Sequence, residues 1–162
     1  MSQLLICMLT LLFSLSSLAM EGNADFRQSS LAAEGGALRF SQTTASPWFS
    51  SEGTFAGQTI SDVAGQLRGG TLSAIDVPVQ TVTMDGNTLI VNTRSSLALS
   101  QAGIPQSAWN IIDVTGNSDV MTSIAARLEN NGLTTSGTST LRITGSGGSA
   151  STYFGAGTIP PH

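Results

Sequence analysis

One run of consecutive polar residues could bind an anion: Asn92, Thr93, Arg94, Ser95 and Ser96. An apolar stretch precedes the run and an apolar-patterned segment follows it, so we expect a strand to deliver these residues to the start of a helix. Free backbone N–H groups, the positive end of the helix dipole and the guanidinium fork of Arg94 could together bind a phosphate group. Asn92 and Arg94 would then be catalytic, and Thr93 and Ser95 would contact substrate. The alternative is that Asn92 and Thr93 cap the helix while Arg94 is solvated.

Further candidates for chemistry lie on both sides of this run. Arg39 and Gln42 lie on an expected first strand, where neighbouring residues face opposite sides, and could contact a substrate. Asp76 and Asp113 could act as acid or base groups. Asp76 could equally be a turn residue, and Asp113 could instead organise the turn that follows it. The indole of Trp109 could stack on a base, or it could lie at the edge of the core.

Several kinds of chemistry are excluded by residues that the chain lacks or misplaces. The only histidine is His162, the last residue, so Ser-His-Asp and His-metal schemes are not expected. The only cysteine is Cys7, which lies in the first apolar stretch and supplies no disulfide or thiolate metal site to the rest of the chain. All six basic residues are arginine, which excludes a Walker P-loop. The net charge of −4 argues against tight, nonspecific binding of nucleic acid.

The chain begins with the pattern of an exported protein. An apolar run of about 15 residues ends in Ser-Leu-Ala, which puts small residues where signal peptidase requires them. We expect a secreted protein with no integral membrane association after cleavage; the alternative is a short membrane anchor. The expected segments are a signal peptide over 1–19, a flexible arm over 20–36, a folded domain over 37–144 and a flexible Gly/Ser/Pro-rich tail over 145–162.

The hydrophobic pattern predicts a small α+β domain with about three helices. The expected elements are a strand over 37–42, a helix over 59–69, a β-hairpin over 77–84 and 88–91, a helix from 94 or 95 to 102, a strand over 110–114, a helix over 118–130 and a strand over 138–144. Thr59 and Asp62 resemble a capping box at the start of the first helix. The mixed order of short elements favours α+β over a doubly wound sheet.

Several short pieces of this pattern resemble the ParB/sulfiredoxin-like fold. More narrowly, they are similar to the C-terminal toxin domains of bacterial Rhs and filamentous-haemagglutinin polymorphic toxins. The matching pieces are Leu38–Gln42, Phe55–Ile60, Leu67–Gly70, Val77–Val79, Asp85–Asn87, Asn92–Ser95 and Gln101–Asn110. The resemblance covers about residues 37–132 and implies a hairpin that feeds a helix.

The resemblance implies phosphate chemistry at the start of the helix after the hairpin, on Asn92, Thr93 and Arg94. Related members include nucleases, nucleotide-hydrolysing clamps and ATP-using reductases. This chain has Arg94 followed by Ser95 where the family often has two arginines, and it lacks the cysteine that the reductases need there, so that activity is excluded.

The first functional hypothesis is a secreted toxin or effector domain that acts on nucleic acid or a nucleotide. Arg94 would bind phosphate, Asn92 and Gln42 would position substrate, and an aspartate such as Asp76 would serve as base or would bind a divalent ion such as Mg²⁺. No metal-ligand motif is present in the sequence itself. An immunity protein is a possible partner. The second hypothesis is a secreted binding module that retains the fold without catalysis.

Overall fold

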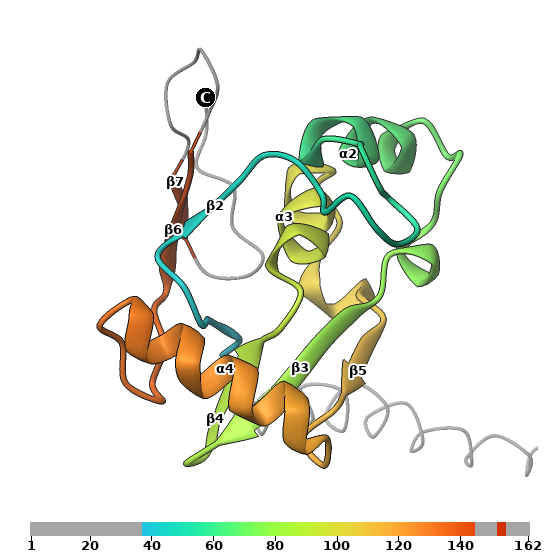
Figure 1. Ribbon diagram of the computed structural model, residues 1–162. Coiled ribbons are helices and arrows are strands. Elements are labelled where there is room, and N and C mark those ends of the chain that lie inside the picture. The colour runs from blue at the N-terminus through green and yellow to red at the C-terminus, as the bar shows by residue number, and fades with distance from the viewer. Residues whose placement is uncertain (1–36, 145–151, 155–162) are drawn as a thin grey trace, which may run out of the picture. The chain divides into compact units, whose positions relative to one another are not determined.

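The computed structural model describes residues 37–144 and 152–154 (Figure 1). The expected signal peptide, the expected arm and most of the expected tail lie outside these residues. No helix in the described ranges has the length and apolar character needed to cross a membrane. Residues 37–144 form a small α+β domain, which confirms the predicted fold class.

The larger sheet has four strands in the order β1-β4-β3-β5. These strands are β1 (Arg39–Phe40), β3 (Val79–Met84), β4 (Asn87–Ile90) and β5 (Ile111–Asp113). β3 and β4 form the predicted antiparallel hairpin, whereas β1 and β5 each pair with it in parallel. Asp85 and Gly86 connect the hairpin strands with φ angles of 48° and 78°. Two successive positive φ values fit a type I′ turn, whose twist matches that of the strands.

The smaller sheet has three strands in the order β2-β6-β7. They are β2 (Thr44–Ala45), β6 (Thr140–Ile143) and β7 (Thr152–Phe154). The expected strand over 37–42 is therefore divided differently: β1 and β2 are two short strands in two sheets. β7 lies within the segment that was expected to be a flexible tail.

Three α-helices complete the described fold, as predicted. They are α2 (Ile60–Arg68), α3 (Thr93–Gln101) and α4 (Ser118–Asn130), with short 3₁₀ helices η1 (Ala74–Asp76) and η2 (Gln106–Ala108). The predicted capping box at α2 is present: the Thr59 hydroxyl accepts from the Asp62 N–H, and the Asp62 carboxylate accepts from the Thr59 N–H. Asn117 caps α4 by accepting from the two N–H groups of Asp119 and Val120.

The two faces of the larger sheet bury different clusters. Ile90 belongs to the cluster that includes the apolar faces of α2 and α3, whereas Leu89 packs with Ile124 and Leu128 of α4. Successive residues of a strand point to opposite faces, so β4 contributes one large side chain to each side. The hairpin is thus held between α2 and α3 on one face and α4 on the other, and α3 begins where β4 ends.

Candidate functional site

The start of α3 is fixed to the hairpin by one side chain, that of Asn92. Its Oδ1 accepts from the Gln80 N–H at 2.8 Å, and its Nδ2 donates to the Pro78 carbonyl at 2.8 Å and to the Ser95 hydroxyl at 3.2 Å. Asn92 therefore joins the start of α3 to the chain at and just before β3. Asn92 is the N-cap residue of α3, as the alternative prediction placed it, but its side chain caps no backbone N–H of α3. It bonds instead to the backbone of Pro78 and Gln80 and to the Ser95 hydroxyl. Because all three contacts are internal, Asn92 positions the site.

Hydrogen-bond donors remain free at the first turn of α3. The Ser95 N–H donates to the Asn92 carbonyl at 3.0 Å, but the amides of Thr93 and Arg94 have no acceptor among the described residues. The Thr93 hydroxyl is buried, and within the described ranges it has no hydrogen-bond partner. A buried hydroxyl without a partner costs free energy, which a bound acceptor would recover. The first turn thus has unfilled capacity for an anion.

Arg94 reaches from this turn to the segment between β2 and α2. Its Nε donates to the Ser46 carbonyl over a long 3.4 Å, and the side chain is half-buried. The two terminal nitrogens of the guanidinium have no partner in the described part of the chain. The geometry therefore leaves the fork of Arg94, the end that matches a phosphate or carboxylate, available for a ligand.

A second arginine, Arg127 of α4, contacts the chain just before the start of α3. It donates to the Val91 carbonyl at 2.7 Å and to the Ser41 hydroxyl at 3.3 Å. Burial lowers the pKa of Arg127, and the positive charge of Arg94 lowers it further. No carboxylate forms an ion pair with either arginine within the described residues. Sequence reasoning missed Arg127, because only the packing of α4 against the hairpin brings it to the start of α3.

Two unpaired cations beside free N–H groups form an arrangement suited to an anion. Like charges held close together raise the energy of the empty site, and a bound anion would offset that cost. The amides at the helix start and the guanidinium fork are donors that phosphate groups use in proteins, and the positive end of the helix dipole also favours an anion. We call this set, made of Thr93, Arg94 and Arg127, the α3 anion site.

Three other predicted site residues contribute no group to the α3 anion site. Ser95 is buried beside the site, and its hydroxyl accepts the bond from Asn92. Arg39 donates from Nε to the Ser136 carbonyl at 3.1 Å, on the loop that follows α4. Gln42 is half-buried and makes no side-chain hydrogen bond within the described residues, and nothing places it in contact with Arg94.

The predicted acid or base, Asp76, and the predicted stacking residue, Trp109, both serve to hold the fold. The Asp76 carboxylate accepts from the N–H and hydroxyl of Ser73, at 2.8 and 2.6 Å, in a capping box of η1. The bond from the Ser73 hydroxyl, with the backbone bond second, lowers the pKa of Asp76, so it is a poor base. Trp109 is a core residue: it is 7% exposed, and its indole donates to the Ile104 carbonyl at 3.0 Å. The core alternative for Trp109 therefore fits the structure.

Asp113 takes the turn role that was its alternative. Its carboxylate accepts from the N–H of Thr115 at 2.9 Å and from the Thr115 hydroxyl. In the described ranges, no group of three or more His, Cys, Asp or Glu side chains is placed to hold a metal ion. A divalent ion such as Mg²⁺ therefore has no three-residue donor group among the residues described.

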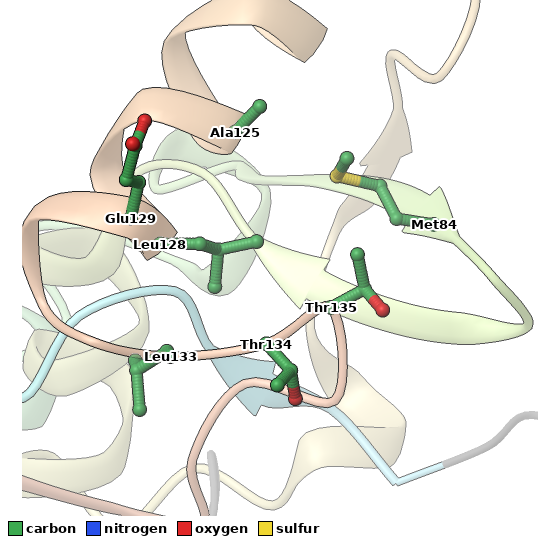
Figure 2. A pocket seen from close by; sticks show the side chains of 7 residues that line it. All are labelled: Met84, Ala125, Leu128, Glu129, Leu133, Thr134 and Thr135. Carbon is green, nitrogen blue, oxygen red and sulfur yellow. The ribbon is translucent and has the colours of Figure 1, made fainter.

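A separate hollow lies between the hairpin and α4. Its volume is about 440 Å³, and its lining residues are Met84, Ala125, Leu128, Glu129, Leu133, Thr134 and Thr135. Figure 2 shows Leu128 extending from α4 toward the strand that carries Met84. The lining is mainly apolar with one carboxylate, so its chemistry differs from that of the α3 anion site. None of the predicted site residues lines it.

Comparison of the chain with models of known protein families gives no match, and neither curated proteins nor solved structures give one. The description that fold and site support is a small α+β domain with two arginines gathered at a helix start.

Proposed function

We propose that this chain is a secreted toxin or effector domain that binds a phosphate group of a nucleotide or nucleic acid at the α3 anion site. The observation that carries the proposal is that two arginines lie at one helix start: Arg94 is in the first turn of α3, and Arg127 bonds to the Val91 carbonyl just before that turn. No carboxylate forms an ion pair with either of them in the described ranges. The resemblance of the hairpin and following helix to ParB-like toxin domains supports the same location. The signal-like start of the sequence supports export.

Each group in the site has a distinct part in this proposal. The free fork of Arg94 would bind two phosphate oxygens, and the amides of Thr93 and Arg94 would donate to a third. The buried Thr93 hydroxyl would gain the partner that it lacks. Arg127 would supply a second positive charge from a position that its bonds to Val91 and Ser41 already fix.

Phosphate-dependent stabilisation tests the proposal. The chain would be unfolded in urea with and without pyrophosphate or a nucleoside monophosphate. A ligand at 100 times its dissociation constant should stabilise the fold by about 2.7 kcal/mol. Arg94→Ala removes a charged donor worth about 1.5–3 kcal/mol, so affinity should fall about tenfold to a hundredfold. At the hundredfold limit, the same ligand concentration would stabilise the variant by only about 0.4 kcal/mol.

Arg142→Ala is the matched control, because it removes the same charge from an exposed position on β6. It should keep the full stabilisation. Equal loss in both variants would mean that the effect reflects net charge alone. Absence of stabilisation by any phosphate compound in the wild-type chain would reject the α3 anion site.

A second candidate function, phosphate binding without catalysis, is favoured by one observation. Asn92 and Asp76, two of the three predicted catalytic residues, are engaged in hydrogen bonds that hold the fold. Incubation with DNA, RNA and nucleotides across divalent metals discriminates the two functions. Turnover that Arg94→Ala abolishes would support the enzyme; saturable binding without turnover would select the binding module.

Export and an immunity protein complete the proposal and have their own tests. Expression of the full chain in a bacterium should release protein that begins at residue 20, which mass spectrometry measures. If the chain is an antibacterial toxin, a small protein encoded beside it should protect the producing cell. Retention of the uncleaved chain, or unchanged growth of target cells that express residues 20–162, would contradict this part of the proposal.

A further inference from the structure

An exposed tryptophan, Trp48, lies on the segment that contacts the α3 anion site. Its side chain is 49% exposed, whereas the other tryptophan, Trp109, is 7% exposed. The large hydrophobic residues that are exposed elsewhere in the described ranges are isoleucines on or beside β5. Within residues 37–144, Trp48 is therefore the one exposed large aromatic ring.

The backbone that carries Trp48 is held firmly against the start of α2. Ile60 donates to the Pro47 carbonyl at 2.8 Å, Phe49 donates to the Gln58 carbonyl at 2.9 Å, and Trp48 forms an isolated β-bridge with Thr59. The Trp48 N–H also donates to the Ser46 hydroxyl at 3.2 Å. The backbone at Trp48 is thus held in place while the ring is exposed. Binding a ligand at this ring would therefore cost little backbone entropy.

The same short segment also carries the contact to Arg94. Arg94 donates to the Ser46 carbonyl. Trp48 is two residues further on, so the Cα atoms of Ser46 and Trp48 are at most about 7 Å apart. In Figure 1 the segment that leaves β2 passes beside α3 on its way to α2. The indole N–H makes no hydrogen bond within the described residues. An exposed ring and a free indole donor therefore lie two residues along the chain from the carbonyl that Arg94 contacts.

Resting on the proposed phosphate binding, we infer that Trp48 stacks on the base of a nucleoside phosphate whose phosphate occupies the α3 anion site. Aromatic rings stack on every base, because each base has a π-face, whereas arginines hold the phosphate. The ligand is then a nucleoside phosphate with little base preference, either free or within a single strand. The stacking role that the sequence suggested for Trp109 falls to Trp48, since Trp109 is buried.

Calorimetric titration of the mature chain tests this inference. Its probes are inorganic phosphate, pyrophosphate, each nucleoside monophosphate and short single-stranded oligonucleotides. Monophosphates should bind about tenfold more tightly than inorganic phosphate, a difference of about 1.4 kcal/mol within the range of base stacking. Trp48→Leu should remove this difference while phosphate affinity stays unchanged. Trp48→Phe should retain part of it, and Ile75→Ser, which removes another exposed apolar side chain, should retain all of it.

Fluorescence gives an independent readout, because the chain contains two tryptophans. Monophosphates should quench wild-type emission and inorganic phosphate should not; Trp48→Leu should abolish the quenching. Tighter binding of oligonucleotides than of monophosphates would identify a single strand as the source, and equal binding would identify free nucleotides.

The outcomes separate this inference from the proposal beneath it. If phosphate and monophosphates bind equally, with Arg94→Ala abolishing both and Trp48→Leu neither, the stacking role is overturned and the anion site stands. If no phosphate compound binds the wild-type chain, the anion site and the stacking role fall together.

Discussion

Replacement of Asn92 by alanine separates a positioning residue from a catalytic one. The substitution removes three hydrogen bonds, to the Gln80 N–H, the Pro78 carbonyl and the Ser95 hydroxyl. Each neutral hydrogen bond contributes a net 0.5–1.5 kcal/mol or so, and the half-buried backbone groups left behind lose their partners. We expect the free energy of unfolding to fall by about 2–4 kcal/mol.

Asn117→Ala is the matched control, since it removes an asparagine that accepts from two N–H groups at an exposed helix start. Such a cap is worth about 1 kcal/mol. Asn92→Asp adds a second comparison. It keeps the acceptor for Gln80 but places a carboxylate oxygen where Nδ2 now donates to the Pro78 carbonyl, at 2.8 Å. The aspartate variant should therefore recover little of the lost stability.

Urea unfolding followed by tryptophan fluorescence measures these differences, because Trp109 is buried in the core. If Asn92 positions the start of α3, Asn92→Ala should lose at least twice as much stability as Asn117→Ala. The positioning role would be refuted if Asn92→Ala lost no more stability than Asn117→Ala and yet lost activity. Asn92 would then be a catalytic residue, as the sequence suggested.

Two further predictions concern the fold. Gly137→Ala should destabilise by about 2–5 kcal/mol, because the residue has φ +57° and the new Cβ would lie 2.5 Å from a β1 carbonyl oxygen. Gly103→Ala, at φ +78° with nothing within 4 Å, should cost only about 1–2 kcal/mol; equal losses in urea unfolding would contradict the close approach of β1 to Gly137. Hydrogen bonds, mainly from neighbouring hydroxyls, lower the pKa of Asp62, Asp76 and Asp113. Because these pKa values are lower in the folded state, their contribution to stability is present above about pH 4 and is lost as the pH falls further, so urea midpoints should drop between pH 5 and pH 2 or so. A urea midpoint that does not change between about pH 5 and pH 2 would contradict the predicted loss of stability in acid.

The sequence predicted the elements whose signals are local. The capping pair Thr59 and Asp62 marked the start of α2, and alternating β-branched residues around the Asp85–Gly86 turn marked the hairpin. The helix expected over 118–130 has those bounds in the structure. Each of these signals acts within a few residues, so no knowledge of the rest of the chain is needed.

The sequence could not predict features that depend on long-range packing. Arg127 bonds to Ser41 from 86 positions away, and Arg94 bonds to Ser46 from 48 positions away. Neither pairing has a spacing rule. The same holds for the division of the first strand: β2 pairs with β6, almost 100 residues later. A sequence shows that Trp48 and Trp109 are both tryptophans, but it does not show which of them is buried. The structure shows that Trp109 is buried and Trp48 is exposed.

The distribution of charge bears on which ligand the α3 anion site can accept. The chain has a net charge of −4, which opposes the approach of a long polyanion such as duplex DNA. Three carboxylates, those of Asp62, Asp76 and Asp113, are engaged in caps and turns, whereas Arg94 and Arg127 have no acidic partner in the described ranges. Two of the five arginines in residues 37–144 thus lie at one helix start of an acidic protein. On the proposed function, this arrangement favours a ligand with a localised phosphate over a long duplex that must be neutralised along its length.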